Sequence, residues 1–67
     1  MTPRQFQAAI DKLGLSQERA GLFFGHSKRQ GQRWALGEAD VPVAVEYAIR
    51  LMLEHDVVPG DLNKDFK

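Results

Sequence analysis

The chain has 67 residues, enough for one compact domain with a small hydrophobic core. It contains no cysteine, which excludes disulfide bonds, zinc–thiolate sites and cysteine nucleophiles. No apolar run approaches the roughly 18 residues that span a bilayer, and no basic-then-apolar segment opens the chain. We therefore expect no membrane association, no signal peptide and a cytoplasmic location.

The formal net charge is zero, but the charges are unevenly distributed along the chain. Residues 16–37 carry a net charge of +3, residues 38–67 carry −4 and residues 1–15 carry +1. The basic segment holds Arg19, Lys28, Arg29 and Arg33 against Glu18 alone. Such asymmetry can orient a protein on a polyanion, with the positive segment toward it.

A first helix is predicted to begin at Thr2 and Pro3, a hydroxyl cap followed by a proline that needs no N–H there. Gly14 should end this helix. Its apolar face has helical spacing and consists of Phe6, Ala9, Ile10 and Leu13.

Two short helices should follow, capped by Ser16 and Ser27 and ended by Gly25 and Gly37. Only His26 lies between Gly25 and the second cap, so these helices must cross at a steep angle. We expect the aromatic side chains to belong to the core rather than to a stacking surface: Phe6, Phe23, Phe24 and Trp34.

A fourth helix is predicted from Pro42 to about His55. One apolar stripe consists of Val45, Ala48, Ile49 and Met52, and a second consists of Ala44, Tyr47 and Leu51. Two stripes are wider than one core-facing seam needs. Either the bundle covers this helix on two sides, or the second stripe is a homodimer interface.

These elements predict an all-α protein, a compact bundle of four or possibly five helices. We expect the domain to span residues 1–58, with a polar tail at 59–67 that frays.

The segment from Ser16 to Glu38, SQERAGLFFGHSKRQGQRWALGE, resembles the helix-turn-helix of the XRE/Cro-type family of bacterial and phage regulators. The matching positions include the opening Gln17, the small Ala20 and Gly21, the core residues Phe24 and Trp34, and the turn glycine Gly25. The resemblance covers most of the chain. It implies a bundle of four or five helices with the motif at the second and third, and binding to double-stranded DNA.

Two positions depart from the family pattern. Gly31 stands where a Val or Ile usually packs beneath the third helix, and a glycine inside a helix costs about 1 kcal/mol relative to alanine. His26 stands where a small apolar residue is usual. We expect both residues to weaken the domain.

The third helix, about residues 27–36, is the predicted recognition helix for the DNA major groove. With Trp34 inward, its polar residues can face outward together. We expect Lys28, Arg29, Gln32 and Arg33 to approach base edges, and Gln17 and Ser27 to bind phosphate. The alternative is an ordinary solvated helix face.

No catalytic or metal-binding constellation is apparent, so we expect no enzyme activity, no cofactor and no small-molecule ligand. His26 and His55 are the only histidines, and their spacing is not that of a metal site. The predicted function is sequence-specific DNA binding in transcriptional regulation, as a homodimer. The alternative is an antitoxin-like adaptor that uses the same fold to bind another protein.

Overall fold

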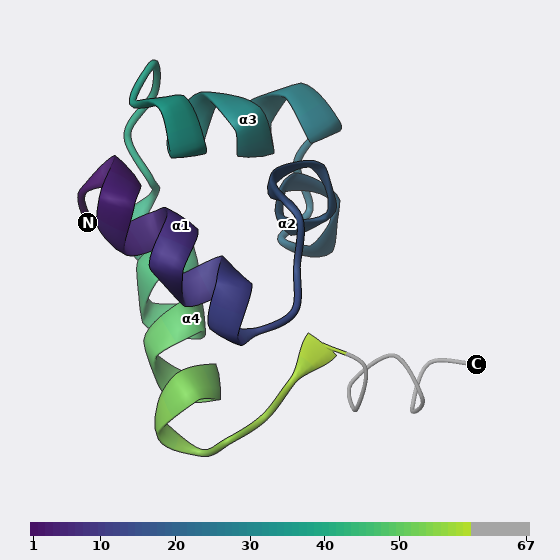
Figure 1. Cartoon of the computed structure of the whole chain (residues 1–67), viewed down its shortest axis with the longest axis vertical. Coiled ribbons are helices and arrows are strands. Elements are labelled where there is room, and N and C mark those ends of the chain that lie inside the picture. The colour runs from purple at the N-terminus through teal and green to yellow at the C-terminus, as the bar shows by residue number, and fades with distance from the viewer. Residues whose placement is uncertain (60–67) are drawn as a thin grey trace.

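The computed structural model describes residues 1–59, and this part of the chain contains four α-helices and no strand (Figure 1). The helices are α1 (Pro3–Lys12), α2 (Gln17–Phe23), α3 (Lys28–Leu36) and α4 (Val43–Glu54). The predicted all-α fold with four helices is therefore confirmed. Residues 60–67, most of the predicted tail, lie outside the described residues.

Side-chain caps begin the first three helices where the sequence predicts them. The Ser16 and Ser27 hydroxyls each accept a hydrogen bond of 3.1 Å, from the backbone N–H of Arg19 and of Gln30. Thr2 caps α1 in a reciprocal box, in which its hydroxyl accepts from Gln5 N and its own N–H donates to Gln5 Oε1. These caps satisfy amides that have no partner inside the helix.

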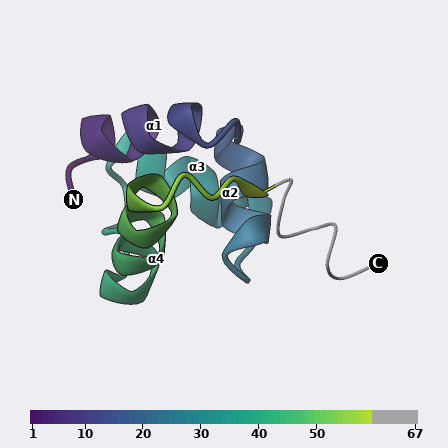
Figure 2. The ribbon, with the colours of Figure 1, turned by 90° about the horizontal axis from the view of Figure 1, so that it is seen from below.

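The core lies where α1 contacts each of the other three helices (Figure 2). Trp34, Phe6 and Ile49 are its largest fully buried side chains, and the rings of Phe6 and Trp34 meet edge to face at 5.7 Å between centroids. Phe23 and Phe24 are half-buried and pack against this core. The four aromatic residues predicted to belong to the core therefore all contribute to it.

Within residues 1–59, helix α4 is covered on one side only. Val45, Ile49 and Met52 face the core, and Ala48 is half-buried at its edge. No other part of residues 1–59 covers the second stripe, because Ala44, Tyr47 and Leu51 are all exposed. Residues 1–59 therefore leave the second stripe uncovered, and its role as a homodimer interface stays a prediction.

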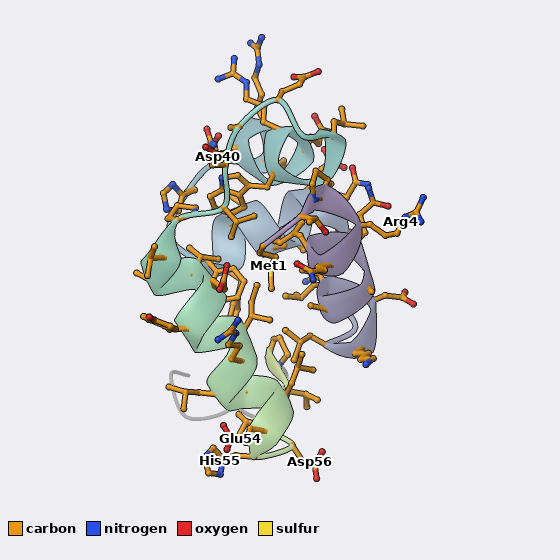
Figure 3. The ribbon with its side chains drawn as sticks, turned by 90° about the vertical axis from the view of Figure 1, so that its left-hand side faces the viewer. Met1, Arg4, Asp40, Glu54, His55 and Asp56 are labelled. Atoms are coloured by element: carbon orange, nitrogen blue, oxygen red, sulfur yellow. The ribbon has the colours of Figure 1, made fainter. Side chains whose placement is uncertain are left out.

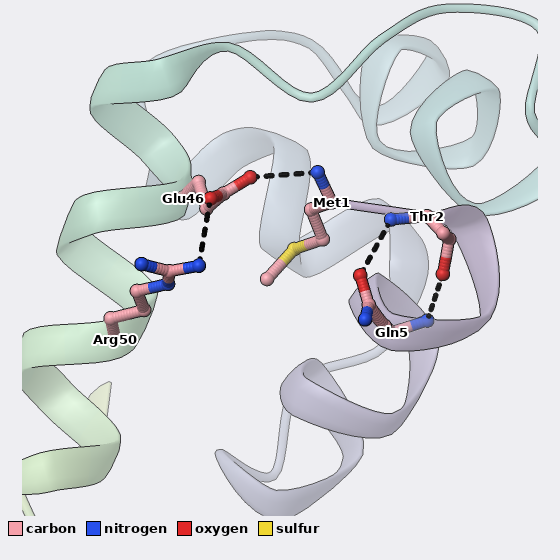
Figure 4. A network of polar contacts seen from close by, with 5 residues as sticks. All are labelled: Met1, Thr2, Gln5, Glu46 and Arg50. Carbon is pink, nitrogen blue, oxygen red and sulfur yellow. Dashed lines mark hydrogen bonds and ion pairs between the residues drawn. The ribbon is translucent and has the colours of Figure 1, made fainter.

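A chain of charged groups joins the N-terminal end of α1 to α4 (Figure 4). The ammonium group of Met1 lies 2.8 Å from Glu46 Oε1, and Arg50 Nη2 lies 3.3 Å from Glu46 Oε2. The hydrogen bond from the ammonium group is the main reason that the pKa of Glu46 lies below its ordinary value. The charges of the ammonium group and of Arg50 lower this pKa further.

No helix within residues 1–59 is long and apolar enough to cross a membrane.

Candidate nucleic-acid interface

Helices α2 and α3 cross with their backbones in direct contact, and two buried glycines form the crossing point. A Cβ atom on Gly21 would overlap the Ser27 carbonyl oxygen and lie 2.8 Å from Gly31 N. A Cβ atom on Gly31 would overlap the Gln17 carbonyl oxygen and lie 2.7 Å from Gly21 N. Neither helix could approach the other this closely with any other residue at either position.

The expectation that Gly31 weakens the domain overlooked this contact. The glycine lowers the intrinsic helix propensity of α3, but the absence of a Cβ atom allows α2 to pack directly on its backbone. The contact that a Val or Ile side chain was expected to make is replaced by one between main chains. Gly31 is therefore required by the packing of α2 on α3.

The crossing also places the two residues predicted to bind phosphate. The Gln17 backbone lies against Gly31 in the middle of α3, and the Ser27 backbone lies against Gly21 in the middle of α2. Ser27 is exposed and the side chain of Gln17 is half-buried. Both residues thus stand at the N-terminal ends of helices whose relative position is set by the glycine pair.

Three of the four residues predicted to approach bases lie on the outer face of α3, and the fourth, Lys28, is exposed in its first turn. Gly31, Trp34 and Ala35 face inward, so the opposite side of the helix remains open to solvent. Lys28, Arg29 and Gln32 are exposed, and Arg33 is half-buried. Among residues 1–59, no ion pair engages Lys28, Arg29 or Arg33, so their charges remain available to an external anion.

Leu36 also belongs to this face, although it was not among the residues predicted to contact DNA. Its side chain is 64% exposed, at the end of α3. It follows Arg29 by seven residues and Gln32 by four, which places all three on one side of the helix. This spacing was the signal in the sequence that could have identified it.

The C-terminal end of α3 is held by α1. The Gln7 side-chain amide donates a hydrogen bond of 2.6 Å to the carbonyl oxygen of Ala35. This bond satisfies a carbonyl in the last turn, which has no partner within the helix. Helix α3 is therefore held at two points, by the glycine crossing at Gly31 and by α1 near the C-terminal end of α3.

His26 covers one side of Trp34 at the turn between α2 and α3. The two rings meet edge to face, with 4.9 Å between their centroids and 72° between their planes. The expectation that His26 weakens the domain did not allow for this contact. Trp34 is buried, and the His26 ring that packs against it is itself exposed to solvent.

A shallow cleft of about 470 Å³ adjoins Gln17, between α1 and the start of α2. Ser16 and Gln17 line one side, and Arg4, Gln7 and Asp11 line the other. The side chain of Arg4 extends outward from α1 (Figure 3). Arg4 was counted in the sequence only as part of the N-terminal charge, but the fold brings it into the cleft that Gln17 lines.

Acidic residues are unevenly placed around this surface, and Asp11 lines the same cleft as Arg4. Glu54 and Asp56 lie with His55 at the end of the molecule opposite α3 (Figure 3). Glu38 and Asp40 follow the C-terminal end of α3, beyond its basic first turns. The basic residues considered for DNA contact are therefore Lys28, Arg29 and Arg33 on α3, and Arg4 beside the cleft between α1 and α2.

No group of three or more His, Asp or Glu side chains within residues 1–59 is arranged to hold a metal ion. No protein-family model, curated protein or solved structure matches this chain.

Proposed function

We propose that the protein binds double-stranded DNA through α3 and acts, as a homodimer, in transcriptional regulation. The observation that carries this proposal is the glycine crossing of α2 and α3. It holds a short helix rigidly against the domain while Arg29, Gln32 and Arg33 point away from it. A helix presented in this way can enter the major groove, which is about 12 Å wide. The resemblance to the XRE/Cro-type helix-turn-helix supports the same conclusion.

The exposed side chains of α3 have the chemistry that base recognition requires. Arg29 and Arg33 can form paired hydrogen bonds with guanine O6 and N7, and Gln32 can do so with adenine. Lys28 can contact bases or phosphates near the start of the helix. Leu36 offers an apolar surface of the kind that contacts the thymine methyl group.

Phosphate contacts come from residues around α3 in this proposal. Ser27 and Gln17 stand at helix starts on either side of the crossing, and Arg4 lies across the cleft from Gln17. Such contacts set the position of a protein on the duplex without reading its sequence. The formal net charge is zero; Glu54 and Asp56 lie at the end of the molecule opposite α3, whereas Asp11 lines the cleft with Arg4.

A domain of this size makes few phosphate contacts, so binding by one copy should be weak and sensitive to salt. Two copies that read half-sites one helical turn apart would bind far more tightly than either alone. For this reason we propose a homodimer as the functional unit.

Fluorescence anisotropy with a dye-labelled duplex tests the proposal. The protein should bind a mixed-sequence duplex at low salt, and binding should weaken steeply as the salt is raised to physiological concentration. A variant with Lys28, Arg29 and Arg33 all replaced by alanine should lose this binding. If it binds as well as the parent protein, α3 is not the DNA-binding element.

The alternative function, an adaptor for another protein, is favoured by one observation: the apolar row on α4 is uncovered within residues 1–59. The variant Tyr47→Glu separates the two functions. In a DNA-binding homodimer it should reduce both self-association and DNA affinity. In an adaptor it should abolish only the capture of the partner protein.

A further inference from the structure

Four side chains form one continuous row on the outer face of α3, here called the α3 row. Its members are Arg29, Gln32, Arg33 and Leu36. Their spacing is that of one helical face, and the buried residues of the helix lie on the opposite side. The first three members are polar or charged, and the last is an apolar side chain that is 64% exposed. The row therefore ends in a group whose chemistry differs from that of the others.

Leu36 is not part of the hydrophobic core that the described residues form. The end of α3 is closed by main-chain groups instead, since the N–H groups of Gly37 and Glu38 both donate to the carbonyl oxygen of Arg33. The side chain of Gln7 holds the same turn from α1. The leucine is therefore presented to solvent from a backbone that other groups already hold in place.

We infer that Leu36 recognises the C5 methyl group of a pyrimidine, thymine or 5-methylcytosine, in the major groove of DNA. The inference rests on the proposed function, which places α3 in that groove, and it specifies the base pair that the end of the helix reads. The methyl group is the apolar feature on the major-groove edge of a base pair. An apolar side chain is its complement, whereas the polar members of the row complement hydrogen-bonding edges.

The spacing along α3 sets the distance between the base pairs that it reads. Leu36 follows Arg29 by seven residues, which corresponds to about 10.5 Å at 1.5 Å per residue. Neighbouring base pairs are about 3.4 Å apart along the duplex. With α3 along the groove, the methyl group should therefore lie about two to three base pairs from the guanine that Arg29 reads.

The charges near Leu36 favour a base over the sugar–phosphate backbone as its contact. Glu38 is exposed two residues after Leu36, so a negative charge stands close to this end of the row. Phosphates repel this carboxylate and attract Arg29 and Arg33, which no ion pair engages within residues 1–59. The two arginines therefore supply the attraction to the backbone, and the leucine contributes a contact that carries no charge.

Leu22 provides the comparison with an ordinary exposed leucine. It is 52% exposed on α2, and it belongs to no row of DNA-contacting candidates. Single exposed leucines are common on protein surfaces. Leu36 differs from Leu22 because it extends the face of α3 that carries the candidate base contacts.

Replacement of single methyl groups in the DNA tests the inference. Selection from random duplexes by the full chain supplies the preferred site, and fluorescence anisotropy measures affinity for it. Each thymine is then replaced in turn by deoxyuridine, which lacks only the methyl group. At one position the replacement should weaken binding about fourfold, the effect of burying one methyl group, and elsewhere affinity should be unchanged.

A second set of duplexes distinguishes the two sources of the methyl group. The thymine–adenine pair at that position is replaced by cytosine–guanine, with the cytosine either methylated at C5 or unmethylated. The methylated duplex should bind about fourfold more tightly than the unmethylated one. The tighter of the thymine and 5-methylcytosine duplexes then identifies the preferred base.

Variants of the protein assign the effect to one side chain. Leu36→Ala should bind the thymine and deoxyuridine duplexes equally, whereas Leu22→Ala should keep the full preference of the parent. Glu38→Gln should raise affinity for all duplexes alike and leave the methyl preference unchanged, because it removes a general repulsion. Circular dichroism checks that the three variants keep the helical content of the parent.

Several results would overturn the inference and leave DNA binding through α3 in place. They are binding without any sequence preference, equal affinity for thymine and deoxyuridine at every position, and a methyl preference that persists in Leu36→Ala. A methyl group more than about four base pairs from the guanine whose preference is lost in Arg29→Ala would also overturn it. Failure of the proposed function is a different observation, since the parent would then bind no duplex at low salt.

Discussion

Gly21 and Gly31 face each other across the crossing of α2 and α3, where a Cβ atom on either would lie less than 3 Å from the backbone nitrogen of the other. Distances this short cannot be relieved by turning a side chain, because the atoms that would collide belong to the two main chains. The pair therefore determines how α3 sits on the domain, and with it the direction in which Arg29 and Gln32 point.

The variant Gly31→Ala should destabilise the protein, although alanine favours helix by about 1 kcal/mol. Forcing α2 and α3 apart should cost more than this gain, so we expect a net loss of about 2 kcal/mol and a melting temperature about 10 °C lower. Thermal unfolding followed by circular dichroism measures the change. Gln32→Ala, on the exposed side of the same helix, serves as the control and should shift stability by less than about 0.5 kcal/mol. A higher melting temperature for Gly31→Ala would show that the helices are not in backbone contact.

The variant His26→Ala should destabilise the protein by about 1 kcal/mol, because it removes the ring that lies edge-on to Trp34. Trp34 is the only tryptophan, so its fluorescence reports unfolding directly. In the folded His26→Ala variant, the emission maximum of Trp34 should lie at a longer wavelength than in the parent, because water reaches the indole ring. His55→Ala is the matched control, because this exposed histidine ends α4 far from Trp34. Equal stability for the two variants would mean that the ring contact contributes nothing.

Glu46 should make the stability of the protein dependent on pH in the acid range. Its pKa lies below the ordinary value of 4.5 in the folded protein, so its interactions stabilise the fold above that value. This contribution should be lost as the pH falls through the lowered pKa and the carboxylate takes up a proton. The melting temperatures of the parent and of Glu46→Gln should therefore differ at neutral pH and converge under acid conditions. A constant difference between them at every pH would contradict this assignment.

Arg4 and Lys12 offer a matched pair of charges on α1. Arg4 lines the cleft beside Gln17, whereas Lys12 lies in a slot with Met52 and Asp56 at the other end of the helix. Arg4→Ala should weaken binding to all duplexes alike and reduce the slope of log affinity against log salt by about 1. Lys12→Ala should leave affinity and slope unchanged. If both variants weaken binding equally, DNA contacts α1 without preference for the cleft.

Arg29 should read bases through the forked shape of its guanidinium group rather than through its charge alone. Arg29→Ala should cost about 1–3 kcal/mol of binding to the preferred site and relax specificity at one position. Arg29→Lys keeps the charge but cannot form the paired hydrogen bonds, so it should lose specificity while its dependence on salt stays close to that of the parent. Affinities for sites found by selection from random duplexes, compared at several salt concentrations, separate these effects. Full specificity in Arg29→Lys would assign Arg29 to a phosphate.

Local signals in the sequence were sufficient to predict the four helices and the turn between α2 and α3. The helix ends are set by residues next to them in the chain: Ser16 and Ser27 cap the N-termini of α2 and α3, and Gly37 ends α3. Such short-range effects can be predicted from the sequence alone. The role of Gly31 could not be read in this way. The low helix propensity of Gly31 can be predicted from its residue type. Its packing against Gly21 depends on how α2 and α3 cross in the folded protein.

The exposed side of α4 was only partly predictable for a related reason. The helix is apolar on most of its circumference, so its sequence does not show which side the core will cover. Tyr47 and Leu51 were identified as a candidate interface, but Val43 was not, although it is the most exposed of the three. Arg4 was missed because its position in the cleft beside Gln17 depends on the fold, whereas the spacing of Leu36 from Arg29 and Gln32 within α3 could have identified it.

The most direct test of the central claim is an NMR titration of the isotope-labelled protein with a mixed-sequence duplex, at low salt and again at physiological salt. The proposal predicts that chemical-shift changes concentrate at Gln17, Ser27, Lys28, Arg29, Gln32 and Arg33, and that they diminish as the salt is raised. An absence of change at low salt, where even non-specific binding should be visible, would contradict DNA binding by this protein. Changes confined to α4 would show that DNA does not bind through α3.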